Sequence, residues 1–194
     1  MKYNINIIFF IILIILLINN NILEYFSDIN KKILDFFIKY DINKDNYIKK
    51  NKKYLKPDNI KFKFIGKNIY NQEIYLEEEA ANAYLKMKNK ALKDGVNLKL
   101  LSGFRSYDYQ DKIIQKKLEK KISLENILKL VKLPGFSQHH TGKAIDFVSE
   151  FKFFENSDQY KWLKNNAKEF GFYMSYPKNN NEMIFEPWHW FYTK

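Results

Sequence analysis

One stretch decides how this sequence is interpreted: Ser137-Gln138-His139-His140-Thr141-Gly142-Lys143-Ala144-Ile145-Asp146-Phe147. It joins two of the chain's three histidines to an aspartate that lies inside an apolar run. The third histidine lies in Phe185-Glu186-Pro187-Trp188-His189-Trp190. The 194 residues include no cysteine, which excludes disulfides and thiolate metal ligands. Any metal must therefore be held by histidine and carboxylate side chains.

The residues around this stretch predict a chain in which helices come early and strands pair late. Acidic residues in the first turn and lysines in the last favour a helix at 76–92 through the helix dipole. Such an order indicates the α+β class, with a small antiparallel sheet flanked by helices. The predicted helices are Leu76–Leu92, Tyr109–Lys120, Leu124–Val131 and Asp158–Phe170, and the predicted strands are Val96–Ser102, Ala144–Val148, Phe172–Tyr176 and Ile184–Tyr192.

The N-terminus predicts export from the cytoplasm. Lys2 precedes an apolar run, Ile7 to Ile18, whose length fits the hydrophobic region of a secretory signal and is short for a membrane span. No small-x-small cleavage site follows, so a cleaved signal peptide and a membrane anchor over residues 1–20 both stay open, with membrane association through residues 5–18. The expected location is the extracytoplasmic cell envelope, either secreted or anchored to the cytoplasmic membrane.

The remainder is expected to form a linker with one short helix over residues 21–55 and a domain over residues 56–194. Ile33, Leu34, Phe36 and Phe37 have the helical spacing that places the short helix. The net charge of 33 − 22 = +11 favours polyanionic partners. Because the lysines are scattered, with no arginine-rich helix or zinc-finger pattern, we do not expect nucleic-acid binding.

The histidine segments supply what a catalytic zinc ion requires. Such a site takes three protein ligands and needs a carboxylate, off the metal, to accept a proton from water. His139, Asp146 and His189 offer the ligands, and Glu186 offers the base. Residues three apart on a flat strand point to opposite faces, so Glu186 and His189 can share one site only if the strand bends or ends there. Pro187 favours such an irregularity.

Three motifs together resemble the D-alanyl-D-alanine carboxypeptidases of the VanY type, which belong to the peptidoglycan metallopeptidases. They are S-x-H-x-x-G-x-A-x-D over residues 137–146, E-x-W-H over residues 186–189, and Ser102-Gly103-Phe104-Arg105-Ser106-Tyr107 with Gln110. The resemblance runs from about Lys56 to Tyr192. It implies a zinc-dependent enzyme, expected as a monomer, that hydrolyses the terminal D-alanine from peptidoglycan stem peptides.

The resemblance also assigns roles to individual residues. Zn²⁺ is expected on His139, Asp146 and His189, with Glu186 as general base and later acid. Arg105 is expected to bind the substrate and stabilise the oxyanion, while Gln110 and Ser137 hold the terminal D-residue. The motif spacing favours His139 over His140 as the ligand. Because neighbours on an extended segment point oppositely, His140 is expected beside the site or exposed.

Two departures from the family pattern affect the expected peptide preference. Ser175 stands where an arginine is common, and the segment Lys178 to Phe185 is shorter than usual. Two alternatives therefore stay open. One is an L,D-carboxypeptidase acting on tetrapeptide stems, and the other is a non-catalytic module that binds the cell wall.

Overall fold

The computed structural model describes residues 28–148, 154–179 and 184–193, in two compact units, Met1–Tyr47 and Ile48–Lys194. The predicted signal or anchor over residues 1–20 lies outside the described residues. Within the described ranges, no helix is long and apolar enough to cross a membrane. The predicted domain start at residue 56 stays a prediction.

The first unit contains a helix over residues 28–39, and α2 (Lys44–Lys50) crosses the boundary between the units. The sequence predicted a linker with one short helix over residues 21–55, and the described part of that segment contains two helices. Ile33, Phe36 and Phe37 are buried, as the helical spacing predicts, but Leu34 is exposed. The Phe37 ring meets the Tyr47 ring edge-on, with centroids 5.7 Å apart.

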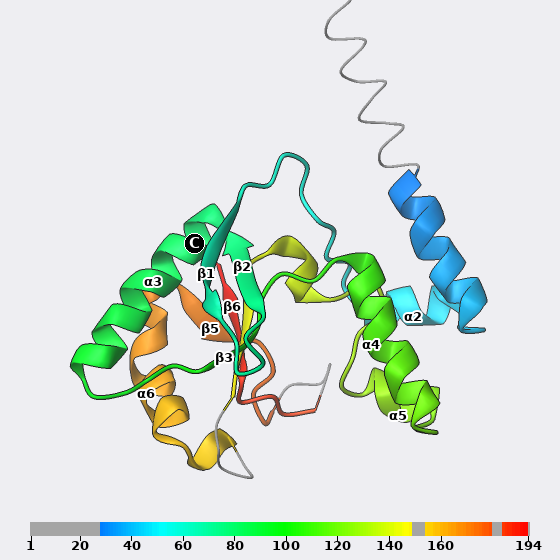
Figure 1. The fold of residues 1–194 in the computed structure, drawn as a ribbon. Coiled ribbons are helices and arrows are strands. Elements are labelled where there is room, and N and C mark those ends of the chain that lie inside the picture. The colour runs from blue at the N-terminus through cyan, green and yellow to red at the C-terminus, as the bar shows by residue number, and fades with distance from the viewer. Residues whose placement is uncertain (1–27, 149–153, 180–183, 194) are drawn as a thin grey trace, which may run out of the picture. The chain divides into compact units, whose positions relative to one another are not determined.

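The second unit combines helices with two small antiparallel sheets, which confirms the predicted mixture of helices and antiparallel strands. A two-stranded sheet pairs β1 with β2, and a four-stranded sheet has the order β3-β4-β6-β5. In Figure 1, α3 and α6 lie on one side of the strands and α4 and α5 on the other. The strands are β1 (Phe62–Lys67), β2 (Glu73–Glu77), β3 (Leu100–Ser102), β4 (Ala144–Phe147), β5 (Phe172–Met174) and β6 (His189–Tyr192), and the helices are α3 (Glu78–Lys93), α4 (Tyr107–Glu119), α5 (Leu124–Leu128) and α6 (Asp158–Asn166), with short 3-10 helices η1 (Gln138–Thr141), η2 (Phe154–Asn156) and η3 (Ala167–Phe170).

The β1–β2 hairpin was not predicted, and it corrects the start of the first predicted helix. Its turn is built by Asn68, whose Oδ1 accepts hydrogen bonds from the backbone N–H groups of Tyr70 (2.9 Å) and Gln72 (3.0 Å). Leu76 is a buried strand residue, not the first residue of a helix. Helix α3 begins only after Glu77, whose carboxylate accepts from two N–H groups of the first turn, each at 3.1 Å.

All four predicted strands are shorter than expected, and for two of them local turns take up the first residues. The Val96 N–H donates to the Ala91 carbonyl at 2.8 Å and so closes the end of α3, which delays β3 to Leu100. The His189 N–H donates to the Glu186 carbonyl at 3.1 Å, which makes residues 186–189 a turn and starts β6 at His189.

Side-chain alternation in β4 and β6 separates the core from the opposite face of the sheet. Ile145 and Phe147 on β4, with Trp190 and Tyr192 on β6, join the hydrophobic core beneath α3 and α6. Asp146 and the β6 residue directly opposite it in the register therefore lie on the other face. The core thus anchors the two strands that present polar side chains to that face.

Truncating a buried leucine of the hairpin should destabilise the protein far more than truncating an exposed one on α3. Leu76 has no exposed surface, so Leu76→Ala leaves a cavity and should cost about 2–5 kcal/mol. Leu92→Ala is the matched control; its side chain is 49% exposed, and its cost should stay below about 1 kcal/mol. Urea unfolding of both variants measures the difference, and equal losses would contradict the assignment of Leu76 to the core.

Candidate metal centre

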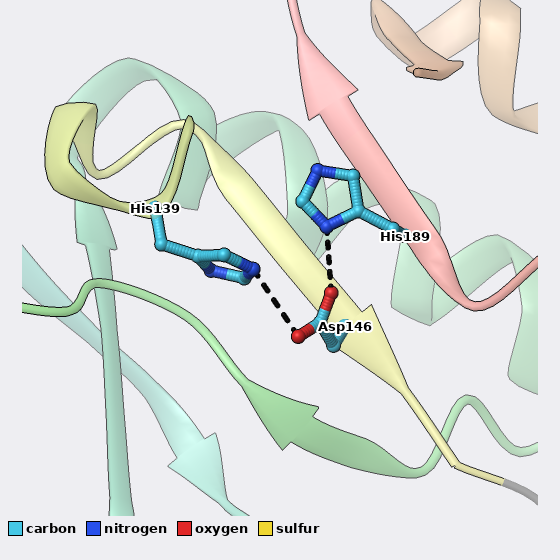
Figure 2. Close-up of side chains that lie close together, drawn as sticks. All are labelled: His139, Asp146 and His189. Carbon is cyan, nitrogen blue, oxygen red and sulfur yellow. Dashed lines mark hydrogen bonds and ion pairs between the residues drawn. The ribbon is translucent and has the colours of Figure 1, made fainter. Parts of the chain in front are cut away.

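The structure brings together the three residues predicted as metal ligands. One nitrogen or oxygen atom from each of His139, Asp146 and His189 lies within 4.8 Å of the others, and all three residues are buried. Figure 2 shows both imidazoles directed at the carboxylate between them. His139 comes from η1, Asp146 from β4 and His189 from β6, where it is the register partner of Asp146. The sheet therefore sets the spacing of two members of this cluster.

The tautomer of His139 follows from its backbone contact. Its Nδ1 lies 2.6 Å from the Gly103 carbonyl oxygen, which can only accept, so Nδ1 carries the proton. Nε2 then presents a lone pair, 3.2 Å from Oδ2 of Asp146. It is among the few buried side-chain atoms of the described residues that have no hydrogen-bond partner. Burial lowers the pKa of His139 to about 4, so the ring is neutral at neutral pH.

His189 shows the same arrangement with its nitrogens reversed. Its Nε2 lies 2.8 Å from the amide oxygen of Gln138, while its Nδ1 lies 2.8 Å from Oδ1 of Asp146. Both partners are acceptors, so a ring with a single N–H can donate to only one of them.

Asp146 is ionised between these rings. Burial alone would raise its pKa, but neighbouring positive charge, that of the Arg105 guanidinium included, holds the pKa of the carboxyl well below its ordinary value. The Asp146 carboxylate, Nε2 of His139 and Nδ1 of His189 thus converge, and each can present a lone pair to a cation. Two nitrogens with one oxygen are a ligand set that zinc accepts. The residues present therefore fit a divalent metal ion.

Glu186 lies in the turn that precedes β6, and β6 begins only at His189. Glu186 and His189 are therefore not both on one flat strand, which is the condition for their sharing a site. The Glu186 side chain is buried, and it lines the same pocket as the three candidate ligands. Burial, followed by the negative charge of Asp146, raises the pKa of Glu186 from 4.5 to about 8, against the opposing charges of Arg105 and Lys132. A carboxyl with this pKa can both accept and release a proton near neutral pH.

The remaining predicted site residues line one pocket of about 380 Å³ beside the cluster. Arg105 donates from Nε to Oγ of Ser102 at 2.8 Å and from Nη2 to Asp146. Gln110 donates to the Lys132 carbonyl at 2.8 Å, and its buried Oε1 has no partner among the described residues. Ser137 is buried at the start of η1 and also lines the pocket.

His140 is neither exposed nor on an extended segment, which corrects the expectation of an extended geometry. It lies on η1, has no exposed surface, and its Nδ1 is 2.7 Å from the Arg105 carbonyl oxygen. Its ring meets the Tyr107 ring edge-on at 4.6 Å. Burial lowers its pKa to about 4. His140 thus contacts the backbone of a site residue and lies beside the cluster, outside the set of converging atoms.

Two contacts of the site were missed by the sequence analysis. Gln138 was quoted in the motif without a role, although its amide oxygen touches His189. Tyr176 packs its ring on the His189 ring, with centroids 5.1 Å apart and planes inclined by 34°. The place of Gln138 next to His139 was an available signal, but both contacts join segments far apart in the sequence and depend on the folded sheet.

Comparisons with known proteins identify the family to which this chain is similar. The family model VanY, described as D-alanyl-D-alanine carboxypeptidase, matches residues 73–194. The Bacillus subtilis protein YodJ is 37% identical over 130 residues, which are 61% of this chain and 46% of YodJ. A D-alanyl-D-alanine carboxypeptidase of Enterococcus faecium is 30% identical over 128 residues, which are 64% of this chain and 39% of that protein. The match thus spans less than half the length of each relative.

Solved structures share the fold. The structure of the LdcB LD-carboxypeptidase matches with a TM-score of 0.60 and 32% sequence identity, covering 71% of this chain and 69% of that one. The structure of VanYB in complex with D-alanine-D-alanine matches with a TM-score of 0.57 and 23% identity, covering 71% of this chain and 81% of that one.

The raised pKa of Glu186 predicts how the stability of the metal-free protein depends on pH. Because the folded pKa of about 8 exceeds the ordinary 4.5, this carboxyl's contribution is fully present below pH 4.5 and is lost as pH rises toward 8. The variant Glu186→Gln cannot ionise. Its stability relative to the unmodified protein should therefore grow between pH 5 and 8, by on the order of a few kcal/mol.

Urea unfolding in chelator-treated buffer at several pH values measures this difference. Glu125→Gln removes an ionisable group whose side chain is 86% exposed, and it should show no comparable trend. A stability difference for Glu186→Gln that stays constant across the pH range would contradict the assigned pKa.

Proposed function

The chain belongs to the VanY family of D-alanyl-D-alanine carboxypeptidases, and from this membership we propose that it is a zinc-dependent carboxypeptidase that releases the terminal D-alanine of peptidoglycan stem peptides. The observation that carries the proposal is the convergence of three buried acceptor atoms beside a carboxyl of raised pKa. A related solved structure, of VanY from the VanB-type resistance cassette, is described as a complex with Zn(II).

In this proposal His139 Nε2, Asp146 and His189 Nδ1 hold the zinc ion. Bound there, zinc supplies Lewis acidity at the scissile carbonyl and makes water more acidic. Glu186 accepts a proton from the attacking water and later returns it to the departing amine of D-alanine. Its buried position in the same pocket as the three candidate ligands supports both steps.

Arg105 is the proposed partner of the negative charge that develops on the carbonyl oxygen. Its guanidinium has five N–H donors, and its contacts to Ser102 and Asp146 use two of them among the described residues. Arg105 also lines the pocket, where a hydrogen bond from one of its remaining donors to an oxyanion would contribute several kcal/mol to transition-state binding. Gln110 and Ser137 are proposed to hold the terminal D-residue, since both line the same pocket.

A second candidate, an L,D-carboxypeptidase, is favoured by the 32% identity to the LdcB LD-carboxypeptidase. Both candidates release D-alanine, and they differ in the residue that precedes the broken bond. The location proposed for either is outside the cytoplasmic membrane, where peptidoglycan lies, and the apolar run at residues 7–18 supports that location.

Defined stem peptides distinguish the two candidates. The zinc-loaded full-length chain should release D-alanine from a pentapeptide stem ending in D-alanyl-D-alanine, and chelation should abolish the release until zinc is restored. Release only from the tetrapeptide stem would replace the D,D assignment with the L,D one. No release from either peptide by a zinc-containing protein would favour the non-catalytic wall-binding module.

Removing the base should abolish turnover while the metal stays bound. Glu186→Gln should lower kcat by about 10²–10⁴-fold with zinc content unchanged, because the amide cannot accept the proton. Glu125→Gln is the matched control on the surface and should leave kcat unchanged. Metal analysis and D-alanine release measure the two quantities, and full activity of Glu186→Gln would show that another group is the base.

A further inference from the structure

The two candidate histidine ligands are oriented by different kinds of groups. For His139 the orienting atom is the Gly103 carbonyl, a backbone acceptor that no side-chain substitution removes. For His189 it is the amide oxygen of Gln138, 2.8 Å from Nε2. The second ligand therefore depends on a side chain that has no assigned role in the proposed function.

His189 needs such a partner because its other nitrogen faces a carboxylate. Nδ1 lies 2.8 Å from Oδ1 of Asp146, and a carboxylate is a strong acceptor that favours a proton on the nitrogen it faces. That tautomer would block Nδ1 as a metal ligand. An acceptor on the far side of the ring stabilises the opposite tautomer, with the proton on Nε2 and the lone pair on Nδ1.

The surroundings of Gln138 hold its amide in place. Its Oε1 accepts a hydrogen bond from Oγ of Ser175 at 2.7 Å, and its Nε2 donates to the hydroxyl of Tyr54 at 3.1 Å. The backbone carbonyl of Gln138 accepts a hydrogen bond from the Thr141 hydroxyl at 2.7 Å, a contact within η1. The residue is buried, so these contacts form away from bulk water.

We propose that Gln138 is a positioning residue that holds His189 in the Nε2-protonated tautomer and thereby leaves Nδ1 to bind the metal ion. This inference rests on the proposed function, because it presupposes the metal site. It also gives Ser175 a role, since its hydroxyl donates to the amide oxygen that faces His189.

Substitutions that separate shape from hydrogen bonding test the proposal. Gln138→Met keeps the volume but removes the acceptor, and it should weaken zinc binding by about 10–100-fold. Gln138→Glu keeps an acceptor for His189 and should bind zinc within about threefold of the unmodified chain, as carboxylate–histidine–zinc arrangements do. Gln110→Met is the matched control, because Gln110 lines the same pocket but contacts the Lys132 carbonyl and no candidate ligand; its zinc affinity should not change.

Zinc affinity of the full-length chain is measured by competition with a chromophoric chelator. Nitrogen-15 NMR of the metal-free protein reports the tautomer directly. The signals of His189 are assigned as those missing from the spectrum of His189→Gln. The unmodified chain should show His189 protonated on Nε2, and Gln138→Met should shift the proton toward Nδ1. If Gln138→Met does not fold, Gln138→Asn replaces it, because the shorter side chain keeps an amide but withdraws the acceptor.

The outcomes distinguish this proposal from the proposed function. An unmodified chain that binds no zinc would overturn both. Zinc binding by the unmodified chain with equal affinity in Gln138→Met would overturn the role of Gln138 and leave the proposed function standing. Equal losses in Gln138→Met and Gln138→Glu would also overturn it, because a role in packing alone predicts no rescue by an acceptor.

Discussion

The burial of one carboxylate, Asp146, is the constraint on which this site depends. Asp146 lies between the imidazoles of His139 and His189, and Arg105 supplies the paired positive charge. An ionised carboxylate in such surroundings is costly unless it is paired or bound to a metal. The arrangement is therefore stable only together with cations, and the surrounding elements keep the acceptors from moving apart.

The four-stranded sheet and the β1–β2 hairpin both hold these groups in place. Ser102, Asp146 and His189 occupy one row across β3, β4 and β6, so the backbone ladder aligns a partner of Arg105 with two of the acceptors. The next residue, Gly103, presents its carbonyl to His139 and packs against β2. A Cβ atom there would lie 2.6 Å from the Tyr75 carbonyl oxygen and 2.7 Å from Ile74. Only glycine allows the hairpin to approach the loop that orients this histidine.

The sequence predicted the three side chains of the cluster, but it did not predict the hairpin and the contacts that surround them. The spacing of His139 and Asp146, and the confinement of all three histidines to two short segments, predicted the side chains that the fold brings together. The β1–β2 hairpin was missed because β1 buries only Ile65 and shows no alternation, while Leu76 continues the apolar pattern of α3. The link from Gln138 to His189 spans 51 residues and exists only once β6 is in the sheet.

The order of the strands has a consequence for biosynthesis. The last strand of the described chain, β6, lies between β4 and β5, so β5 has no partner and β4 has only β3 until β6 has been made. A nascent chain that has emerged only as far as β5 exposes two unpaired strand edges and holds an incomplete set of acceptors. The metal centre and the closure of the sheet therefore arise in one late event, and a chain truncated before residue 189 loses both together.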